Sequence, residues 1–308
     1  MEELFYNKLK EILSEDQIKL NEPMELHTSL HIGGKADYFA MPGSIDQIRE
    51  IIKLCKQSKM PYYVIGNGSN LLVADSGFRG LIIKLGESFS AVEVKENGLI
   101  TAQSGVLLSK LANIAAEHGL TGLEFASGIP GTLGGAVTMN AGAYDGEMKQ
   151  CLLRARLLDE EGNIVEYDTE QLQLGYRKSI LQTLPYVVLE ADIQLAFGDK
   201  EQIRQKMNTL NRQRREKQPL DKFSAGSTFK RPEGYFAGKL IADAGLKGYQ
   251  VGDAAVSEKH CGFIINKEHA TARDFLTVME DVARIVYEKF GVRLEPEVKM
   301  LGDFSRDE

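Results

Sequence analysis

A glycine-rich stretch at residues 122–148 constrains this chain of 308 residues more than any other feature. It reads GLEFASGIPGTLGGAVTMNAGAYDGEM, with seven glycines and almost no charge in its middle. Glycine is unfavourable for ordering a chain, so such a cluster indicates positive φ angles or a molecule that approaches the backbone closely. Bare amides in tight turns suit anions, above all phosphates. A mobile loop is the other interpretation, but apolar Ile129, Leu133 and Val137 between the glycines are unlike a linker and favour a ligand cradle.

Composition limits the classes of protein to which the chain can belong. A hydrophobic fraction of 43% and a charged fraction of 26% are ordinary for a globular protein, and 308 residues predict two or three subdomains. The net charge of −7 argues against a nucleic-acid or anionic-membrane partner. The three cysteines are far apart, and the five histidines include one HxxxH pair, His27 and His31, with no cysteine or third histidine close to it in the sequence. We therefore expect neither a disulfide framework nor a metal site.

The N-terminal residues MEELFYNKLKEIL predict an amphipathic packing helix and not a leader peptide. The sequence also lacks an apolar run of about eighteen residues, the length that a membrane-spanning helix requires. We therefore expect a cytoplasmic protein without a membrane partner.

Two further glycine motifs invite comparison with nucleotide-binding fingerprints. GGK at 33–35 is not a P-loop, because Ala36 stands where Ser or Thr would hold magnesium and the upstream glycine is missing. GNGSN at 66–70 follows the strand-like YYVI and can seat a phosphate, although a simple turn is the alternative. It is not a Rossmann fingerprint, since a third glycine, a following helix and a ribose-binding acid are not in place.

Apolar periodicity predicts several helices and strands around these motifs. Helices are expected over residues 2–14, 107–118 and 199–217, another that Ser44 and Gln47 open as a capping box, and a long one from Thr271 to Phe290. The helix over 199–217 places Ile203, Met207 and Leu210 inward and its cations outward on a solvated face: Arg204, Arg212, Arg214, Arg215 and Lys217. Strands are expected at 91–95, 99–103, 152–158, 163–167 and 186–196.

Two polar residues stand in settings that spacing alone does not make catalytic. Arg177 lies in the tight GYRKS segment, where an ordinary surface cation is the simpler interpretation. Ser227 lies in AGSTFK, where a serine behind glycine usually serves as a turn or cap residue, and no GxSxG elbow makes it a nucleophile.

Six motifs, taken together and in order, resemble the UDP-N-acetylenolpyruvoylglucosamine reductases, flavoenzymes of bacterial cell-wall precursor synthesis. The motifs are IGNGSN at 65–70, IPGTLGGAVTMNAGAY at 129–144, GYRKS at 175–179, AGSTFKRP at 225–232, LKGYQVGDAAVS at 246–257 and LEPEV at 294–298. The similarity runs from about residue 23 to residue 302 and is closest to the shorter variety of the family. Only ILQTLP separates Ser179 from the strand at Tyr186, so the loop that carries a substrate-binding Tyr in the longer variety is absent, and Arg231 stands where that variety has Asn.

The resemblance implies an α+β fold of the vanillyl-alcohol-oxidase type. Two subdomains, at residues 1–85 and 86–218, would hold FAD, and a third at 219–297 would bind the substrate, with the tail at 298–308 packed on the first. NADPH would be the co-substrate, using the substrate cleft before the enolpyruvyl sugar enters. We expect a monomer that acts on small molecules.

The resemblance also implies the roles of individual residues. Ser227 would be the proton donor, while Arg177 and Glu297 would stabilise the intermediate. The substrate would contact Tyr176, Lys217, Lys230, Arg231 and Gln250. The cofactor would lie against both glycine regions and be held by Gly66, Asn67, Gly68, Ser69, Asn70, Gly128, Ile129, Pro130, Gly131, Gly134, Gly135, Asn140, Gly142 and Ala143.

Two other functions are compatible with parts of this pattern. Another oxidase or dehydrogenase of the same flavin fold would be reoxidised by oxygen or a quinone and would not need Arg177, Ser227 and Glu297 together. A non-catalytic protein that binds a sugar nucleotide or phosphate would purify colourless. The reductase is favoured over both, because its polar residues come from motifs in separate parts of the chain.

Overall fold

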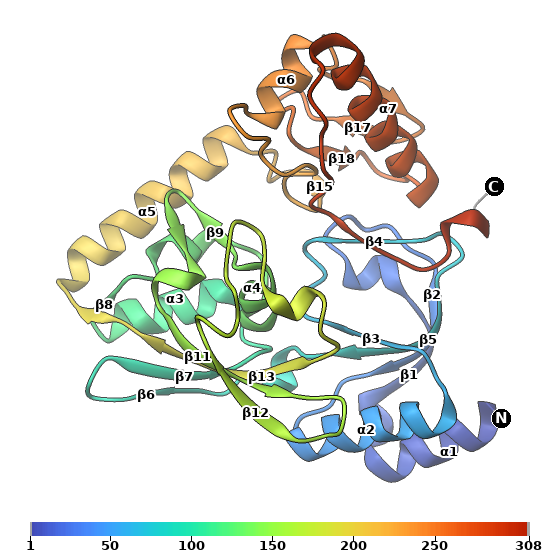
Figure 1. Ribbon diagram of the computed structural model, residues 1–308, viewed down its shortest axis with the longest axis vertical. Helices are drawn as coiled ribbons and strands as arrows, with labels where there is room; N and C mark the ends of the chain where they lie inside the picture. The colour runs from blue at the N-terminus through green and yellow to red at the C-terminus, as the bar shows by residue number, and fades with distance from the viewer. Residues whose placement is uncertain (1, 307–308) are drawn as a thin grey trace. The chain divides into compact units, whose positions relative to one another are not determined.

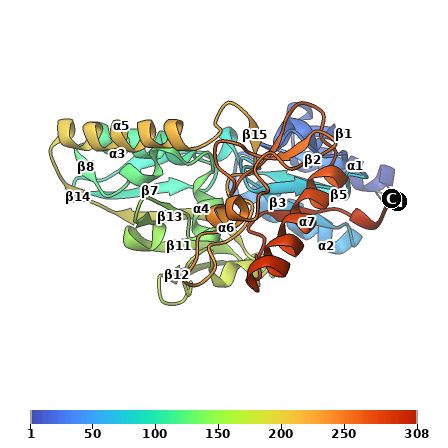
Figure 2. The same ribbon diagram turned by 90° about the horizontal axis from the view of Figure 1, so that it is seen from above.

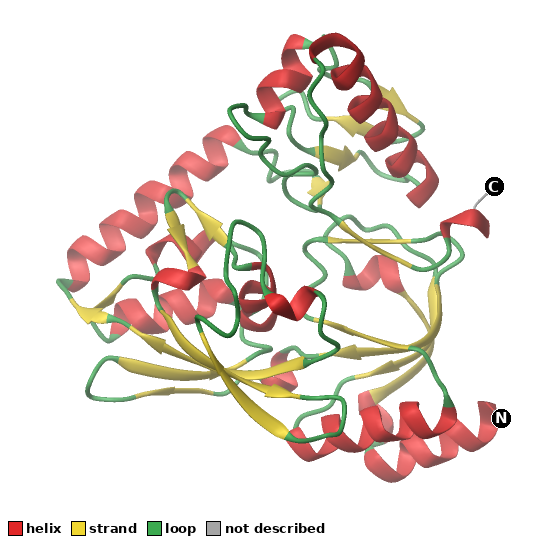
Figure 3. Ribbon diagram, in the orientation of Figure 1, coloured by secondary structure: helices red, strands yellow, loops and turns green. Residues whose placement is uncertain are grey.

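The computed structural model describes residues 2–306, which fall into two compact units. Unit 1 comprises the residues up to 19 together with 38–67 and 80–214, and unit 2 comprises 20–37, 68–79 and the chain from 215 onward. Both units mix helices and strands (Figure 3). The division into three subdomains that the resemblance implies stays a prediction, and residues 307 and 308 of its tail lie outside the described part of the chain.

One sheet of four strands is formed within residues 18–84. This sheet has the order β1-β2-β5-β3 (Figure 1), and its strands are β1 (Ile18–Pro23), β2 (Lys35–Ala40), β3 (Tyr62–Ile65) and β5 (Phe78–Lys84). β3 and β5 run parallel, with Tyr62 opposite Leu81. After GNGSN the chain forms β4 (Leu71–Val73) and then β5, so no helix follows this motif directly.

A five-stranded antiparallel sheet in the order β12-β11-β13-β7-β6 forms the centre of unit 1. Its strands agree with the expected positions to within a few residues: β6 (Val92–Val94), β7 (Leu99–Gln103), β11 (Leu152–Leu158), β12 (Ile164–Asp168) and β13 (Val187–Gln194). A second small sheet pairs β8 (Leu120–Thr121) with β14 (Ala196–Phe197). Gly98 ends the turn between β6 and β7 with a φ of +78°.

Two helices cover one face of this sheet, α3 (Leu108–Glu117) and α5 (Lys200–Lys217) (Figure 2). Their apolar side chains share one core with alternate residues of the strands, among them Leu111 and Met207 from the helices and Ala102, Ala155 and Ala191 from the sheet. α4 (Leu133–Met139) joins the same core through Leu133 and Val137. The glycine-rich stretch therefore contains a short buried helix and is not a mobile loop.

A second core of unit 1 lies under α1 (Glu2–Ile12) and α2 (Ile45–Ser58). The two helices pack side by side (Figure 1) through Phe5, Leu9 and Ile48, against apolar residues of β5 and β13. Among the described helices, none combines the length and the apolar character that crossing a membrane requires.

Unit 2 contains a four-stranded antiparallel sheet in the order β15-β18-β17-β16. Its strands are β15 (Phe223–Ser224), β16 (Gln250–Val251), β17 (Ala254–Val256) and β18 (Ile264–Asn266), and its helices are α6 (Ala237–Asp243) and α7 (Ala272–Phe290). Phe275, Val278 and Val282 of α7 share a core with these strands and with Leu30 and Ile32. Near the C-terminus, β19 (Lys299–Leu301) runs parallel to β4, which places residues 299–301 beside residues 71–73.

The helix caps explain where the long helices begin and end. Thr271 and Asp274 form a capping box at the start of α7, and Gly291 ends the helix with a φ of +68°. Asp75 adds a cap that no local pattern indicated, because its carboxylate accepts the N–H groups of Ala272 at 2.8 Å and Arg273 at 3.1 Å.

Two details of the expected helices were wrong. Ser44 does cap α2, but the side chain of Gln47 accepts the N–H of Gly43 at 2.8 Å, so the capping box is not formed. In α5, Arg214 does not lie on the solvated face. It is half-buried because the end of the helix packs against Gly128 of the glycine-rich stretch, where a Cβ would meet Arg214 Cδ at 3.1 Å.

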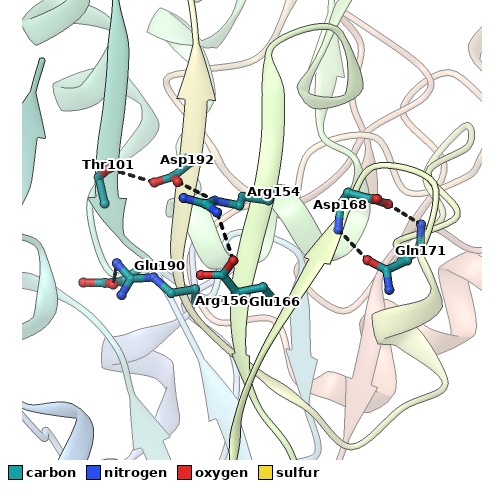
Figure 4. Close-up of polar contacts among 8 residues, drawn as sticks. All are labelled: Thr101, Arg154, Arg156, Glu166, Asp168, Gln171, Glu190 and Asp192. Carbon is teal, nitrogen blue, oxygen red and sulfur yellow. Dashed lines mark hydrogen bonds and ion pairs between the residues drawn. The ribbon is translucent and has the colours of Figure 1, made fainter.

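Charged side chains cover the outer face of the five-stranded sheet (Figure 4). Arg154 of β11 bonds Asp192 of β13 through Nε at 2.7 Å and Glu166 of β12 through Nη1 at 3.0 Å. Thr101 of β7 donates to Asp192 at 2.7 Å, and Arg156 pairs with Glu190. Burial acts to raise the pKa of Asp192, but the hydrogen bonds from Thr101 and Arg154 and the two cations outweigh it, so this pKa lies below its usual value.

The low pKa of Asp192 makes part of the stability depend on pH. Ionised Asp192 stabilises the fold above the usual aspartate pKa, and this contribution is lost as the pH falls below that value toward the pKa of the folded state. We expect Asp192→Asn to lower the free energy of unfolding by about 1 kcal/mol near pH 7 and by less near about pH 3, which is below the usual aspartate pKa. Urea unfolding at both pH values measures this, with exposed Glu170→Gln as the control. A deficit of the same size at both pH values would contradict the prediction.

Candidate functional site

The two glycine regions of unit 1 touch each other. Asn67 Nδ2 donates to the carbonyl of Pro130 at 2.7 Å, and a Cβ on Gly66 would lie 2.0 Å from Thr132 Oγ1. Only glycine permits this approach at position 66, since real Cβ atoms do not come so close to a neighbouring atom. The structure therefore places the start of the GNGSN loop against the IPGT segment. The roles of these residues in binding FAD stay predictions.

Gly134 and Gly135 are adjacent in α4 but have different surroundings. At Gly134 a Cβ would lie 2.9 Å from Ser104 Cβ, and the Gly134 N–H donates to the carbonyl of Ser104 at 2.8 Å. At Gly135 a Cβ would meet nothing closer than Thr132 Oγ1 at 4.0 Å, and the residue is exposed. Within residues 2–306 the Gly135 N–H has no hydrogen-bond partner. Packing explains Gly134, whereas the protein itself leaves Gly135 free for an approaching ligand.

The neighbouring amides are partly used inside the protein. The Ile129 N–H donates to the carbonyl of Ala126 at 3.0 Å, and the Gly131 carbonyl accepts from Leu108 at 3.0 Å. Gly128 packs against α5, where a Cβ would meet Asn211 Oδ1 at 2.6 Å. Fewer backbone groups are therefore free to bind a ligand than the number of glycines suggests, because some of the N–H and C=O groups of this stretch already bond within the protein.

Asn140 connects three segments of unit 1. It ends α4 with a φ of 43° and is fully buried. Its Nδ2 donates to Glu147 Oε2 at 3.0 Å and to the carbonyl of Gly175 at 2.9 Å, while its Oδ1 accepts from the Lys149 N–H at 2.9 Å. The amide thus fixes the hairpin of β9 (Gly142–Ala143) and β10 (Gly146–Glu147) and the GYRKS segment against α4.

The GYRKS segment forms a tight turn that presents Tyr176 and Arg177. Gly175 and Lys178 exchange backbone hydrogen bonds of 3.0 and 3.1 Å. Arg177 has a φ of 52°, and its Nη2 donates to the carbonyl of Gly142 at 3.1 Å. A left-handed backbone at a non-glycine residue is strained and is typical of functional sites. The structure therefore brings Arg177 to predicted cofactor residues, which spacing alone did not indicate.

In unit 2 two predicted catalytic residues lie on adjacent, paired segments. The Glu297 N–H donates to the carbonyl of Thr228 at 2.8 Å, and Phe229 pairs with Pro296 in an antiparallel bridge. This pairing places Ser227, next to Thr228, beside Glu297. Asn70 Nδ2 donates to the Glu297 carbonyl at 3.0 Å, so a predicted cofactor residue joins the same cluster.

Cationic side chains gather along the same paired segments. Lys230 pairs with Glu295 and, with Arg231, lines a cavity of about 440 Å³. Burial, followed by the nearby charge of Lys230, lowers the pKa of Lys299. No sequence motif indicated Lys299, although it lies two residues after Glu297 in an extended segment, and such residues share a face.

The other predicted residues of unit 2 are placed as follows. Gly68 has a φ of +60°, and a Cβ there would meet the carbonyl of His27 at 2.0 Å, so its glycine is required by the backbone. Lys217 is exposed at the end of α5. Gln250 lies on β16, at the opposite edge of the sheet from β15, and its side chain donates to the carbonyl of Gly252 at 2.6 Å. No contact links Gln250 to the Ser227 segment in the described part of the chain.

The comparisons with known proteins agree with this arrangement. Residues 36–168 match a family model described as FAD binding domain, and residues 218–301 match one described as UDP-N-acetylenolpyruvoylglucosamine reductase, C-terminal domain. UDP-N-acetylenolpyruvoylglucosamine reductase from Caldanaerobacter subterraneus subsp. tengcongensis is 52% identical over 303 residues, covering 98% of this chain and 100% of the relative. The enzyme of that name from Clostridioides difficile is 50% identical over 298 residues, covering 97% and 98%.

A solved structure shows the same fold. The crystal structure of UDP-N-acetylenolpyruvylglucosamine reductase from Thermus caldophilus superposes with a TM-score of 0.78 at 36% identity, covering 92% of this chain and 98% of that one. The α+β FAD-binding fold expected from the sequence is thereby confirmed.

The contrast between the two glycines of α4 can be tested directly. We expect Gly135→Ala to leave the apoprotein as stable or to stabilise it by up to about 1 kcal/mol, because alanine favours a helix, while it weakens FAD binding. Gly134→Ala, the matched control, should lower the melting temperature because of the contact with Ser104. Thermal melting and FAD titration of the two apoproteins measure this. Unchanged FAD affinity in Gly135→Ala would show that no ligand approaches there.

Proposed function

The chain belongs to the family of UDP-N-acetylenolpyruvoylglucosamine reductases, and from this premise we propose which of its residues carry out the reaction. It is an FAD-dependent oxidoreductase that reduces the enolpyruvyl group of UDP-N-acetylglucosamine enolpyruvate to give UDP-N-acetylmuramate, in peptidoglycan precursor synthesis. NADPH is the proposed source of the electrons. We further propose a cytoplasmic monomer, with residues 1–85 and 86–218 holding FAD and residues 219–297 binding the sugar nucleotide.

The residues of unit 1 fit an FAD phosphate region. The Asn67–Pro130 contact supports this by joining the two glycine regions, and the open space at Gly135 lets a ligand approach the backbone. Bound FAD supplies the hydride. We assign the binding surface to residues of both glycine regions, with Asn140 acting through the segments that it fixes.

The intermediate formed on the substrate needs cationic and polar partners. Hydride addition to the terminal carbon of the enol ether leaves negative charge on the adjacent carbon and the carboxylate, and prearranged groups stabilise such charge best. The guanidinium of Arg177 has the planar fork that suits a carboxylate. Its strained backbone and its bond to the Gly142 carbonyl support this role.

Ser227 is the proposed proton donor, and the pairing of its segment with Glu297 is the observation that carries this assignment. The 2.8 Å bond from the Glu297 N–H to the Thr228 carbonyl keeps the two residues on adjacent segments. A neutral hydroxyl is a weak acid, so it needs neighbours that stabilise the alkoxide or return its proton. Lys230, three residues after Ser227, is the group of unit 2 proposed for this task, and Glu297 is proposed to stabilise the intermediate together with Arg177.

The substrate is proposed to contact Lys217, Lys230, Arg231 and Gln250 in unit 2 and Tyr176 in unit 1. Lys230 and Arg231 line one cavity together with Arg293, Glu233 and Glu295, and the three cations among them support the assignment of Lys230 and Arg231 to the diphosphate. Support for Gln250 is weaker, because its side chain bonds within its own hairpin.

Separate measurement of the two half-reactions tests the role of Ser227. In Ser227→Ala we expect anaerobic bleaching of the flavin absorbance by NADPH to proceed nearly as in wild type. Recolouring by the enolpyruvyl sugar nucleotide should be slower by about 10²- to 10⁴-fold, the usual contribution of a general acid. Stopped-flow absorbance resolves both steps, with Ser224→Ala as the control. Equal loss in both half-reactions would refute the assignment.

A further inference from the structure

Arg214 differs from the other cations of α5 in its surroundings. Arg212 and Arg215 are exposed, whereas Arg214 is half-buried. Its side chain passes Gly128, where a Cβ would lie 3.1 Å from Arg214 Cδ and 3.5 Å from its Nη1. Gly128 is two residues before Pro130, whose carbonyl accepts from Asn67. Arg214 therefore lies at the glycine region that is proposed to hold the cofactor phosphates.

The charge of Arg214 has no partner in the protein. Within residues 2–306 its guanidinium makes no hydrogen bond and no ion pair, although other arginines of unit 1, such as Arg49, Arg154 and Arg156, each pair with a carboxylate. Burial lowers the pKa of Arg214, and the only opposing influence is the Tyr144 hydroxyl. An unpaired, half-buried cation destabilises a fold. A role in binding an anion would explain why it is there.

Arginine is suited to this task because its planar, permanently charged fork binds phosphate oxygens in pairs. Gly128 is the complementary feature. A side chain at position 128 would meet Asn211 Oδ1 at 2.6 Å and obstruct the path of Arg214. The absence of a side chain at Gly128, in the glycine-rich stretch, thus makes room for the side chain of Arg214, in α5.

We propose that Arg214 binds the pyrophosphate of FAD and supplies the positive charge that the amides of the glycine regions lack. This inference rests on the proposed function and adds to it a cation from a helix that the sequence assigns to a solvated surface. The Gly128–Pro130 segment belongs to the part of the chain that matches the FAD-binding family model, which favours the cofactor phosphates over those of the sugar nucleotide.

Stability and cofactor affinity should change in opposite directions when the charge is removed. Arg214→Met keeps the length of the stem that packs against Gly128 and removes the cation. We expect the apoprotein to melt at the same temperature or higher, while the Kd for FAD rises about 10- to 100-fold, as loss of a charge-assisted hydrogen bond predicts. FAD binding should also become less sensitive to salt. Arg214→Lys should bind FAD with intermediate affinity, and exposed Arg212→Met should match wild type.

These measurements use apoprotein titrated with FAD, followed by flavin fluorescence, and melting by circular dichroism. If Arg214→Met binds FAD as tightly as wild type, the assignment is wrong. If its melting temperature falls in proportion to its FAD affinity, Arg214 acts through packing and the assignment is also wrong. If wild type and Arg212→Met both fail to bind FAD, the proposed function fails as a whole. These outcomes are distinguishable, because the Arg212→Met control separates loss of the cofactor site from loss of Arg214.

Discussion

The buried amide of Asn140 holds together the segments of unit 1 that carry the proposed site residues. One side chain satisfies the hairpin of β9 and β10 through Glu147 and Lys149, and the GYRKS turn through Gly175. A buried amide left without these partners would destabilise the fold, so the three segments are fixed together. The positions of Gly142 and Arg177 depend on this arrangement, because the Arg177 guanidinium bonds the Gly142 carbonyl.

Charge is handled in two different ways within unit 1. On the outer face of the five-stranded sheet each buried or half-buried charge has an opposite partner, and these pairs stabilise the fold at neutral pH. At the end of α5, Arg214 has none among the described residues. A protein keeps such an unfavourable charge where function requires it, and the surrounding glycines indicate the same trade of stability for binding. Gly135 is a second such case, because no atom of the described residues lies close enough to exclude an alanine there.

In unit 2 the proposed chemistry depends on backbone pairing between distant parts of the sequence. The segment at 228–230 pairs with the segment at 295–297, and Asn70 reaches the latter through its side chain. None of these segments has a long regular element of its own. Their positions come from the core of α7 and the four-stranded sheet, and from the parallel pairing of β19 with β4.

The sequence by itself determined the elements and the identity of the family. Periodicity located the strands of the five-stranded sheet and the helices α1, α2, α3, α5 and α7, because apolar spacing is a local property. Six ordered motifs identified the reductase family, which the relatives confirm. Only the tertiary structure decided which glycines serve packing and which leave open space, since this depends on atoms far away in the chain, such as Ser104 for Gly134. For the same reason local patterns missed the cap from Asp75, the neighbourhood of Lys299 and the burial of Arg214. A helical pattern shows that a cation faces away from its own core, but not which other segment covers it.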